Sequence, residues 1–318
     1  MFPWITENRL FILARQAARL PHILIVLLLG LAIALLSQFG AIPVIVTQVL
    51  IYGFSETGVE TSEMSALVSG SWMAATLISS FAGIFLFLWL WTRFFEKRSL
   101  ASLGLELPGA LIKYARGFLF GIILFGGAVG LLAVAGFVEI EQGNPSTQGA
   151  AALGGVLIVL IGWIVQGAGE EVLTRGWMLP VLSARYKPWV GIIVSSLFFA
   201  VLHGLNPNLS VIAMINLALF GFFAAFYALR EGSLWGICAL HSVWNWVQGN
   251  IFGFEVSGGS FGGGTLLNLM ETGPDWFTGG PFGPEGGLAV TIMLLVGMAF
   301  IFFWPAKTQE TFPESMQE

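Results

Sequence analysis

Residues 150–183 read AAALGGVLIVLIGWIVQGAGEEVLTRGWMLPVLS, a long apolar run that contains only three charged side chains. A helix that crosses a bilayer needs about 20 predominantly apolar residues. Comparable runs recur near 22–52, 68–92, 117–138, 188–205, 209–229, 234–251 and 286–304. We therefore expect an all-α polytopic membrane protein with about eight transmembrane helices.

The composition supports the same fold class. Of the 318 residues, 56% are hydrophobic and 10% are charged, and the mean hydropathy is +0.85. Soluble domains carry about 25% charged residues, which excludes an ordinary soluble fold. The 13 Lys and Arg residues form no long basic run, and this argues against nucleic acid as a partner. Cys238 is the only cysteine, so no intrachain disulfide is expected.

The positions of the charges predict the orientation of the chain. When eight spans are threaded with the N-terminus in the cytoplasm, every basic residue falls on the cytoplasmic side, namely Arg9, Arg15, Arg19, Arg93, Lys97, Arg98, Lys113, Arg116, Arg175, Arg185, Lys187, Arg230 and Lys307. The charged residues on the opposite side are all acidic, namely Glu56, Glu60, Glu63, Glu139, Glu141, Glu255, Glu271, Asp275 and Glu285. Because cytoplasmic loops are enriched in Lys and Arg, we expect both termini in the cytoplasm of a multi-pass plasma-membrane protein.

Composition also divides the chain into parts. Residues 1–20 are expected to form a basic interfacial segment, and residues 21–305 a single transmembrane helical domain. Within that domain, residues 253–287 are rich in Gly and Pro and predict an exterior loop, with a short helix around Leu266 to Met270. Residues 306–318 predict a polar cytoplasmic tail.

Polar side chains inside the apolar spans point to a functional site. A charged residue at the centre of a membrane helix costs roughly 2.5–3.5 kcal/mol on insertion scales, so each one needs a partner or a function. The side chains in question lie on three spans and are Glu170, Glu171, Arg175, His203, His241 and Asn245. His22, in contrast, stands at the very start of the first span and is expected to be interfacial.

Glu170 and Glu171 are expected to have different roles. Neighbouring side chains on a helix point about 100° apart, so we expect the two carboxylates to face different partners. Glu171 and Arg175 are four residues apart and predict an ion pair on one helix face. Glu170 then has no partner on its own helix. It either serves as a general acid or base, or hydrogen-bonds to a neighbouring helix and specifies packing.

The histidines favour the catalytic alternative. A single histidine in an apolar span is most often a packed core residue, but His203 and His241 occur on two spans beside an unpaired Glu170. Asn245 follows His241 by four residues, so both side chains project from one helix face and can address one substrate group.

If the site hydrolyses peptide bonds inside the membrane, the classes of protease that it could belong to can be narrowed by elimination. An aspartyl protease needs two aspartates, and Asp275 is the only one. The His-Glu-x-x-His motif of zinc proteases is absent. A Gly-x-Ser-x-Gly match at 258–262 lies in the Gly-rich loop without a flanking strand or helix, and we interpret it as chance. The remaining set consists of a glutamate, two histidines and an asparagine.

This set resembles the CAAX protease and bacteriocin-processing (CPBP) family of intramembrane proteases. The resemblance rests on three motifs in order, Glu170-Glu171-x-x-x-Arg175, Phe199-x-x-x-His203 and His241-x-x-x-Asn245. The segment Arg98 to Leu105 also resembles the cytoplasmic lead-in of that family. The resemblance covers about residues 95–250, which it identifies as the protease core.

The resemblance implies an intramembrane endopeptidase acting on membrane-associated or prenylated CAAX-type substrates. Glu170 with His203 would hold and deprotonate the attacking water, and His241 with Asn245 would donate hydrogen bonds to the oxyanion. Glu171 and Arg175 would form a structural pair, and Phe199 would pack within the motif. The implied partners are the lipid bilayer and a peptide or membrane-protein substrate.

Three alternatives accompany this hypothesis. Zinc could be held by Glu170, His203 and His241, but this version lacks a free base, so we favour a mechanism without a cofactor. A non-proteolytic membrane scaffold or immunity protein could share the fold. A proton-coupled transporter with Glu170 as its proton site is less favoured, because no paired half-repeats are visible. Substrate is expected to approach from the cytoplasm, the face from which spans 188–205 and 234–251 begin.

Overall fold

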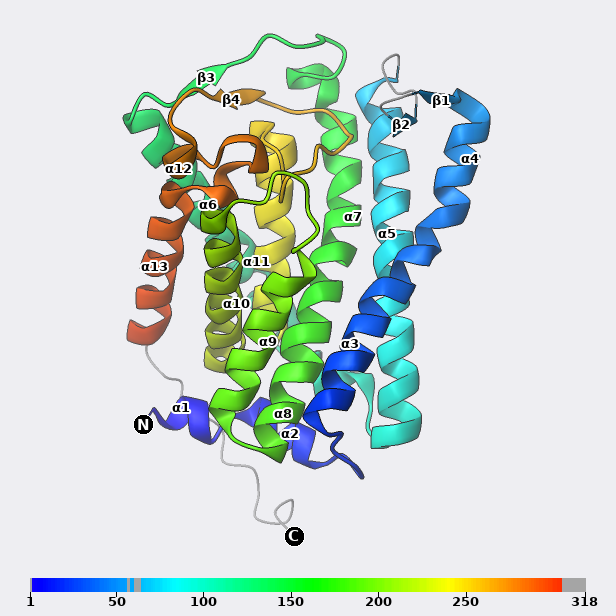
Figure 1. The fold of residues 1–318 in the computed structure, drawn as a ribbon, viewed down its shortest axis with the longest axis vertical. Helices are drawn as coiled ribbons and strands as arrows, with labels where there is room; N and C mark the ends of the chain where they lie inside the picture. The colour runs from blue at the N-terminus through cyan, green and yellow to red at the C-terminus, as the bar shows by residue number, and fades with distance from the viewer. Residues whose placement is uncertain (1, 56–57, 60–63, 305–318) are drawn as a thin grey trace.

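The computed structural model describes residues 2–55, 58–59 and 64–304 as a bundle of helices that run roughly along one axis (Figure 1). All eight predicted apolar ranges contain a helix. The helices are α3 (Ile23–Gln38) with α4 (Ile42–Tyr52), α5 (Ala66–Trp91), α6 (Ala110–Val134), α7 (Leu153–Glu171) with α8 (Leu179–Arg185), α9 (Pro188–Leu202), α10 (Val211–Glu231), α11 (Trp235–Trp246) and α13 (Leu288–Phe303).

Several of these helices meet the requirements for crossing a membrane. In the described residues, five continuous helical stretches are long and apolar enough, and α9 and α13 are shorter apolar helices. α11 is not among these apolar helices because it contains several polar residues, and it lies at the centre of the bundle (Figure 1). The predicted all-α polytopic membrane fold is therefore confirmed.

Two short helices lie across the lower end of the bundle in Figure 1, within the segment predicted to be interfacial. They are α1 (Pro3–Thr6) and α2 (Arg9–Arg15). Asn8 caps α2 and also donates from Nδ2 to the carbonyl oxygen of Leu229 at 2.7 Å. Arg9 forms an ion pair with Glu106 at 2.6 Å. These contacts fasten the segment to the ends of α10 and α6.

The exterior loop covers the opposite end of the bundle. It contributes β4 (Leu269–Glu271), which pairs antiparallel with β3 (Val138–Ile140), and the short helix α12 (Asp275–Thr278). The predicted short helix around 266–270 is wrong, because the backbone there pairs with a strand that lies more than a hundred residues earlier in the sequence. The last described helix, α13, returns to the end where α1 lies, and Phe302 contacts Trp4 with a ring separation of 5.5 Å.

Glycines allow the central helices to pack at very short distances. A Cβ atom on Gly117 of α6 would lie 1.9 Å from the carbonyl oxygen of Gly236 at the start of α11. A Cβ on Gly155 of α7 would lie 2.1 Å from the carbonyl oxygen of Ala66 in α5. Small residues at such crossings let helix backbones approach each other in a membrane, where van der Waals packing drives association.

Gly117→Ala is expected to destabilise the fold by about 2 kcal/mol or more, because the added methyl group meets a backbone atom that cannot move aside. Gly130 lies on the same helix, and a Cβ there would meet nothing within 4 Å. Gly130→Ala is the matched control and should be neutral or stabilising by up to about 1 kcal/mol, as for alanine replacing glycine in a helix. Unfolding of both purified variants in detergent measures the difference, and equal stability would contradict the packing described.

Glu271 of β4 is a partly buried acid at the covered end of the bundle. Its Oε1 atom is buried and has no hydrogen-bond partner among the described residues. Burial raises the pKa of this carboxyl to about 7, a backbone hydrogen bond lowers it, and the charges of Glu255 and Asp275 raise it further.

A folded-state pKa above the unfolded value means that the folded protein holds this proton while the unfolded chain releases it. The stability contribution of Glu271 is therefore greatest below about pH 4.5, falls as the pH rises to about 7, and is level above that. The expected loss is about 3 kcal/mol. Glu271→Gln should remove this slope from unfolding measured between pH 4.5 and 8, whereas Glu139→Gln, at an exposed position on β3, should leave it intact. An unchanged slope in Glu271→Gln would refute the assignment.

Candidate active site

The site is built around a break in the regular winding of the fourth predicted span. α7 ends at Glu171 and continues as a π-helix, η5 (Val172–Met178), before α8 begins. Pro180 in the first turn of α8 has no backbone N–H to donate to the preceding turn, which favours such an irregular segment. At the start of this segment, Thr174 Oγ1 donates to the carbonyl oxygen of Glu170 at 2.6 Å. π-turns of this kind are frequent at functional sites.

Glu171 and Arg175 form a completely buried ion pair. Arg175 NH1 lies 3.1 Å from Glu171 Oε1, and both side chains are 0% exposed. Arg175 also donates to Thr174 Oγ1 at 2.7 Å and to the carbonyl oxygen of Gly221 on α10 at 3.1 Å. Its guanidinium lies over the ring of Phe199, 4.5 Å from the ring centre. The guanidinium of Arg175 thus has partners on α7, η5, α9 and α10, and its Nε atom is buried without a hydrogen-bond partner among the described residues.

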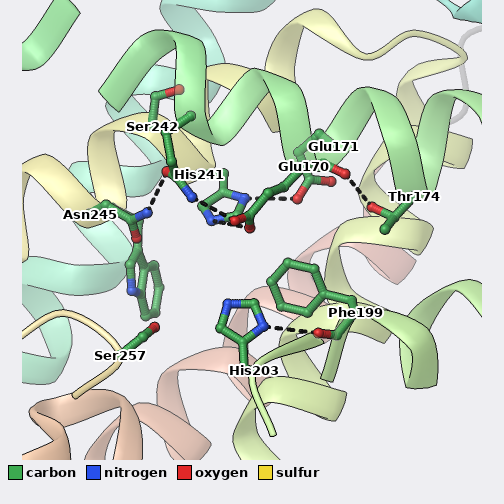
Figure 2. Close-up of polar contacts among 12 residues, drawn as sticks. Glu170, Glu171, Thr174, Phe199, His203, His241, Ser242, Asn245 and Ser257 are labelled. Carbon is green, nitrogen blue, oxygen red and sulfur yellow. Dashed lines mark hydrogen bonds and ion pairs between the residues drawn. The ribbon is translucent and has the colours of Figure 1, made fainter. Parts of the chain in front are cut away.

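Both glutamates face His241 of α11, which differs from the separate partners expected from their positions on the helix. His241 Nδ1 lies 2.8 Å from Glu171 Oε1, and His241 Nε2 lies 3.7 Å from Glu170 Oε2 (Figure 2). The physical reason is the shape of imidazole, whose two nitrogens point in different directions. One histidine can therefore approach two carboxylates that diverge from adjacent residues.

Glu170 is held by a residue that the sequence motifs did not include. Gln166 Nε2 donates to Glu170 Oε1 at 2.8 Å, and Asn245 Nδ2 donates to Gln166 Oε1 at 2.9 Å. Because a carboxylate only accepts, these contacts fix the orientation of both amides. Glu170 Oε2 is buried and has no hydrogen-bond partner among the described residues. The signal that could have revealed Gln166 is its position, four residues before Glu170 in an otherwise apolar run.

His203 lies directly after the end of α9, across an opening from the glutamates (Figure 2). Its Nδ1 lies 2.9 Å from the carbonyl oxygen of Phe199, so Nδ1 carries the proton and Nε2 is left as an acceptor. No hydrogen bond or ion pair joins His203 directly to Glu170 in the described residues. The ring of Phe199 packs between the two histidines, 4.8 Å from His203 and 5.9 Å from His241.

All four predicted catalytic residues line one cavity of about 430 Å³. Its other walls are mainly apolar and include Trp163, Phe220 and Trp244. This volume lies in the range of pockets that hold small ligands, and a few polar groups in an apolar wall are typical of such sites. The six polar residues singled out in the spans therefore converge, with Glu170, His203, His241 and Asn245 at the cavity and Glu171 and Arg175 behind it.

The exterior loop also contributes to the cavity, which the sequence did not predict. Ser257 and Glu285 line it, and Glu285 Oε2 accepts hydrogen bonds from the backbone N–H and the hydroxyl of Ser257 at 2.7 and 2.8 Å. Glu285 Oε1 accepts from Trp244 Nε1 of α11 at 3.2 Å. Ser260, the serine of the Gly-x-Ser-x-Gly match, is exposed and does not line the cavity. The loop is thus attached to the site through Glu285.

The proposed zinc ligands do not form a metal site in this geometry. Over the residues described, no three His, Cys, Asp or Glu side chains lie close enough together to hold a metal ion. Glu170 and His241 face each other at 3.7 Å, but His203 stands across the cavity and does not join them. Glu170, His203 and His241 are therefore not arranged as a three-ligand metal site among the described residues.

Arg175→Met should destabilise the protein by about 3–5 kcal/mol, because it leaves the buried Glu171 carboxylate with His241 as its remaining partner. Adding Glu171→Gln to that variant removes the unpaired charge and should recover at least about 2 kcal/mol. The measurement is the free energy of unfolding of wild type, both single variants and the double variant. A double variant no more stable than Arg175→Met alone would show that the pair does not carry this energy.

One comparison with known proteins places the site in a family. Residues 152–247 match the family model described as type II CAAX prenyl endopeptidase Rce1-like. The match runs from just before α7 to just after α11 and includes all three motifs. No curated protein and no solved structure matches the chain significantly. Residues 152–247 of this membrane protein therefore match the Rce1-like family model of the CPBP family.

Proposed function

We propose that the protein is an intramembrane endopeptidase in which Glu170 activates the attacking water. The observation that carries this proposal is that Glu170 lines the cavity while its Oε2 atom is buried, has no hydrogen-bond partner among the described residues and lies 3.7 Å from His241 Nε2. The other oxygen, Oε1, is held by Gln166. A carboxylate that is fixed through one oxygen and has no hydrogen-bond donor on the other is suited to accept a proton from a water bound beside it.

The reaction proceeds by addition and elimination. The water oxygen forms a bond to the carbonyl carbon of the scissile peptide, and its proton passes to Glu170 Oε2. The carbonyl oxygen becomes the oxyanion of a tetrahedral intermediate. The bond from carbon to nitrogen then breaks, Glu170 returns the proton to the leaving amine, and the products are a carboxylic acid and an amine.

Asn245 and His241 supply the donors for the oxyanion. One hydrogen of Asn245 Nδ2 is bonded to Gln166, so the amide is oriented with its second hydrogen available. His241 donates from Nδ1 to Glu171 and, when protonated, can donate from Nε2 toward the cavity. Each such donor is worth about 3 kcal/mol of transition-state stabilisation.

His203 has a supporting role from the opposite wall. Its Nε2 is an acceptor, because Nδ1 is committed to the carbonyl oxygen of Phe199. It can therefore accept a hydrogen bond from the second proton of the water or from the N–H of the substrate backbone. This arrangement keeps His203 in the mechanism inferred from the motifs without a direct contact to Glu170.

Glu170→Gln is expected to lower the rate of peptide cleavage at least about 10³-fold, since the amide retains the shape of the side chain but cannot accept a proton. The assay uses purified protein and a peptide library analysed by mass spectrometry, with thermal unfolding as a check that the variant is folded. Glu139→Gln, an exposed acid outside the cavity, is the control and should cleave at the wild-type rate.

The same assay with a zinc chelator distinguishes the mechanism without a cofactor from one in which zinc activates the water. The proposal predicts an unchanged rate, and a loss that added zinc restores would contradict it. Cleavage that persists in Glu170→Gln would also contradict it, and cellular activity that survives both Glu170→Gln and His203→Ala would favour a non-proteolytic scaffold instead.

A further inference from the structure

The cavity is closed toward the end of the bundle where α1 and α2 lie. α3 packs closely on its neighbours at Gly30, where a Cβ atom would lie 3.2 Å from the ring of Phe198 and 3.3 Å from the sulfur of Met178. The backbone of α3 therefore closes against α9 and η5 at this level. Among the described residues, no lining residue comes from the connections at that end of the bundle.

The cavity opens on the other side of this closure. α3 leans away from α9 as it rises in Figure 1, and its residues Ala34, Leu35 and Gln38 line the cavity, one to two turns beyond Gly30. Leu35 is 57% exposed and Gln38 is also exposed, so this part of the cavity wall lies at the outer surface of the bundle and is not packed against another helix. The mouth thus faces sideways, between α3 and the connection from α9 to α10.

The exterior loop forms the far rim of this mouth. Asn206 of the α9–α10 connection donates from Nδ2 to the carbonyl oxygen of Ser257 at 2.9 Å, and Asn208 donates to the carbonyl oxygen of Pro281 at 3.2 Å. Asn206 and Ser257 both line the cavity. The polar part of the rim therefore lies toward the end that the exterior loop covers.

The basic residues gather at the closed end. Exposed basic side chains there include Arg15, Arg19, Arg93, Lys97 and Lys187, which lie at or after the end of α2, just beyond the end of α5 and on the connection from α8 to α9. The rim near the exterior loop carries acids, of which Glu285 lines the cavity. Since basic residues mark the cytoplasmic end of a membrane protein, the closed end is the cytoplasmic one. This arrangement differs from the cytoplasmic approach expected from the sequence.

We propose that the cavity receives its substrate sideways from the non-cytoplasmic half of the bilayer, an inference that rests on the proposed function. The substrate class is a membrane-anchored peptide whose scissile bond follows its anchor on the non-cytoplasmic side. Apolar side chains that line the cavity, including Leu35, Leu77 and Phe81, suit the last residues of the anchor. Asn206 and Ser257 suit the backbone of the extended stretch that follows, since a peptide backbone inside a membrane needs hydrogen-bond partners.

Thiol labelling tests the direction of the opening without relying on activity. The native Cys238 is buried, so its background reaction is small. Ser257→Cys places a thiol in the cavity wall, and Ala18→Cys places one at the closed end. With a membrane-impermeant maleimide added to intact cells, Ser257→Cys should react at least tenfold faster than Ala18→Cys. No reaction at Ser257→Cys, or faster reaction at Ala18→Cys, would overturn the inference.

Cleavage of two matched reporters tests the substrate class. Both carry one transmembrane anchor and the same peptide stretch, placed on either the cytoplasmic or the non-cytoplasmic side, and cells producing Glu170→Gln give the blank. The non-cytoplasmic reporter should yield at least tenfold more product. Preferential cleavage of the cytoplasmic reporter would overturn the inference while leaving the proposed function intact. If neither reporter is cleaved, the proposed function fails, and the labelling result decides the direction of the opening.

A variant at the mouth tests the path itself. Leu35→Trp should lower kcat/KM for the anchored reporter at least fivefold by narrowing the mouth. Leu31 lies one turn earlier on the same exposed face of α3 but does not line the cavity, so Leu31→Trp is the control and should leave kcat/KM unchanged. Equal rates in the two variants would contradict entry between α3 and α9.

Discussion

The guanidinium of Arg175 is a charge with no exposure to solvent, in the middle of an apolar bundle. Removing such a group from water costs several kcal/mol, which a partner of opposite charge and additional hydrogen bonds offset. Glu171 supplies the charge, Thr174 and the backbone of Gly221 supply acceptors, and Phe199 supplies an aromatic face. Four helical elements must therefore converge at one point, and the position of the candidate active site follows from that convergence.

The chemistry depends on how the two glutamates are used. Glu171 is occupied by Arg175 and by Nδ1 of His241, so it holds the imidazole in place. Glu170 is held through one oxygen by Gln166, and its other oxygen has no hydrogen-bond partner among the described residues and lies 3.7 Å from Nε2 of the same imidazole. A carboxylate held by an ion pair behind the cavity thus stands next to one that lines the cavity, and we propose that the second takes part in proton transfer. This division accounts for two adjacent acids in a membrane helix, where each is costly.

The parts of this arrangement that the sequence predicts are those with local signals. Apolar runs predict the helices, and the spacing of Glu171 and Arg175 predicts their pairing. The shared contact of both glutamates with His241 was not predictable, because it depends on the rotation of α11 against α7. Gln166 meets Asn245 across 79 residues of sequence, and Ser257 enters the cavity from a loop whose composition indicates only flexibility. β4 was missed for the same reason, since its partner strand is distant in the chain.

The central claim is that Glu170 acts on water and does not itself attack the peptide. A single turnover of the purified protein in water enriched in oxygen-18 tests this claim directly, with mass spectrometry of the product and of the enzyme fragment that contains Glu170. The account predicts one labelled oxygen in the new carboxyl group of the product and none in Glu170. Label in the Glu170 carboxyl would mean that a covalent acyl intermediate had been hydrolysed at that side chain, and it would contradict the account.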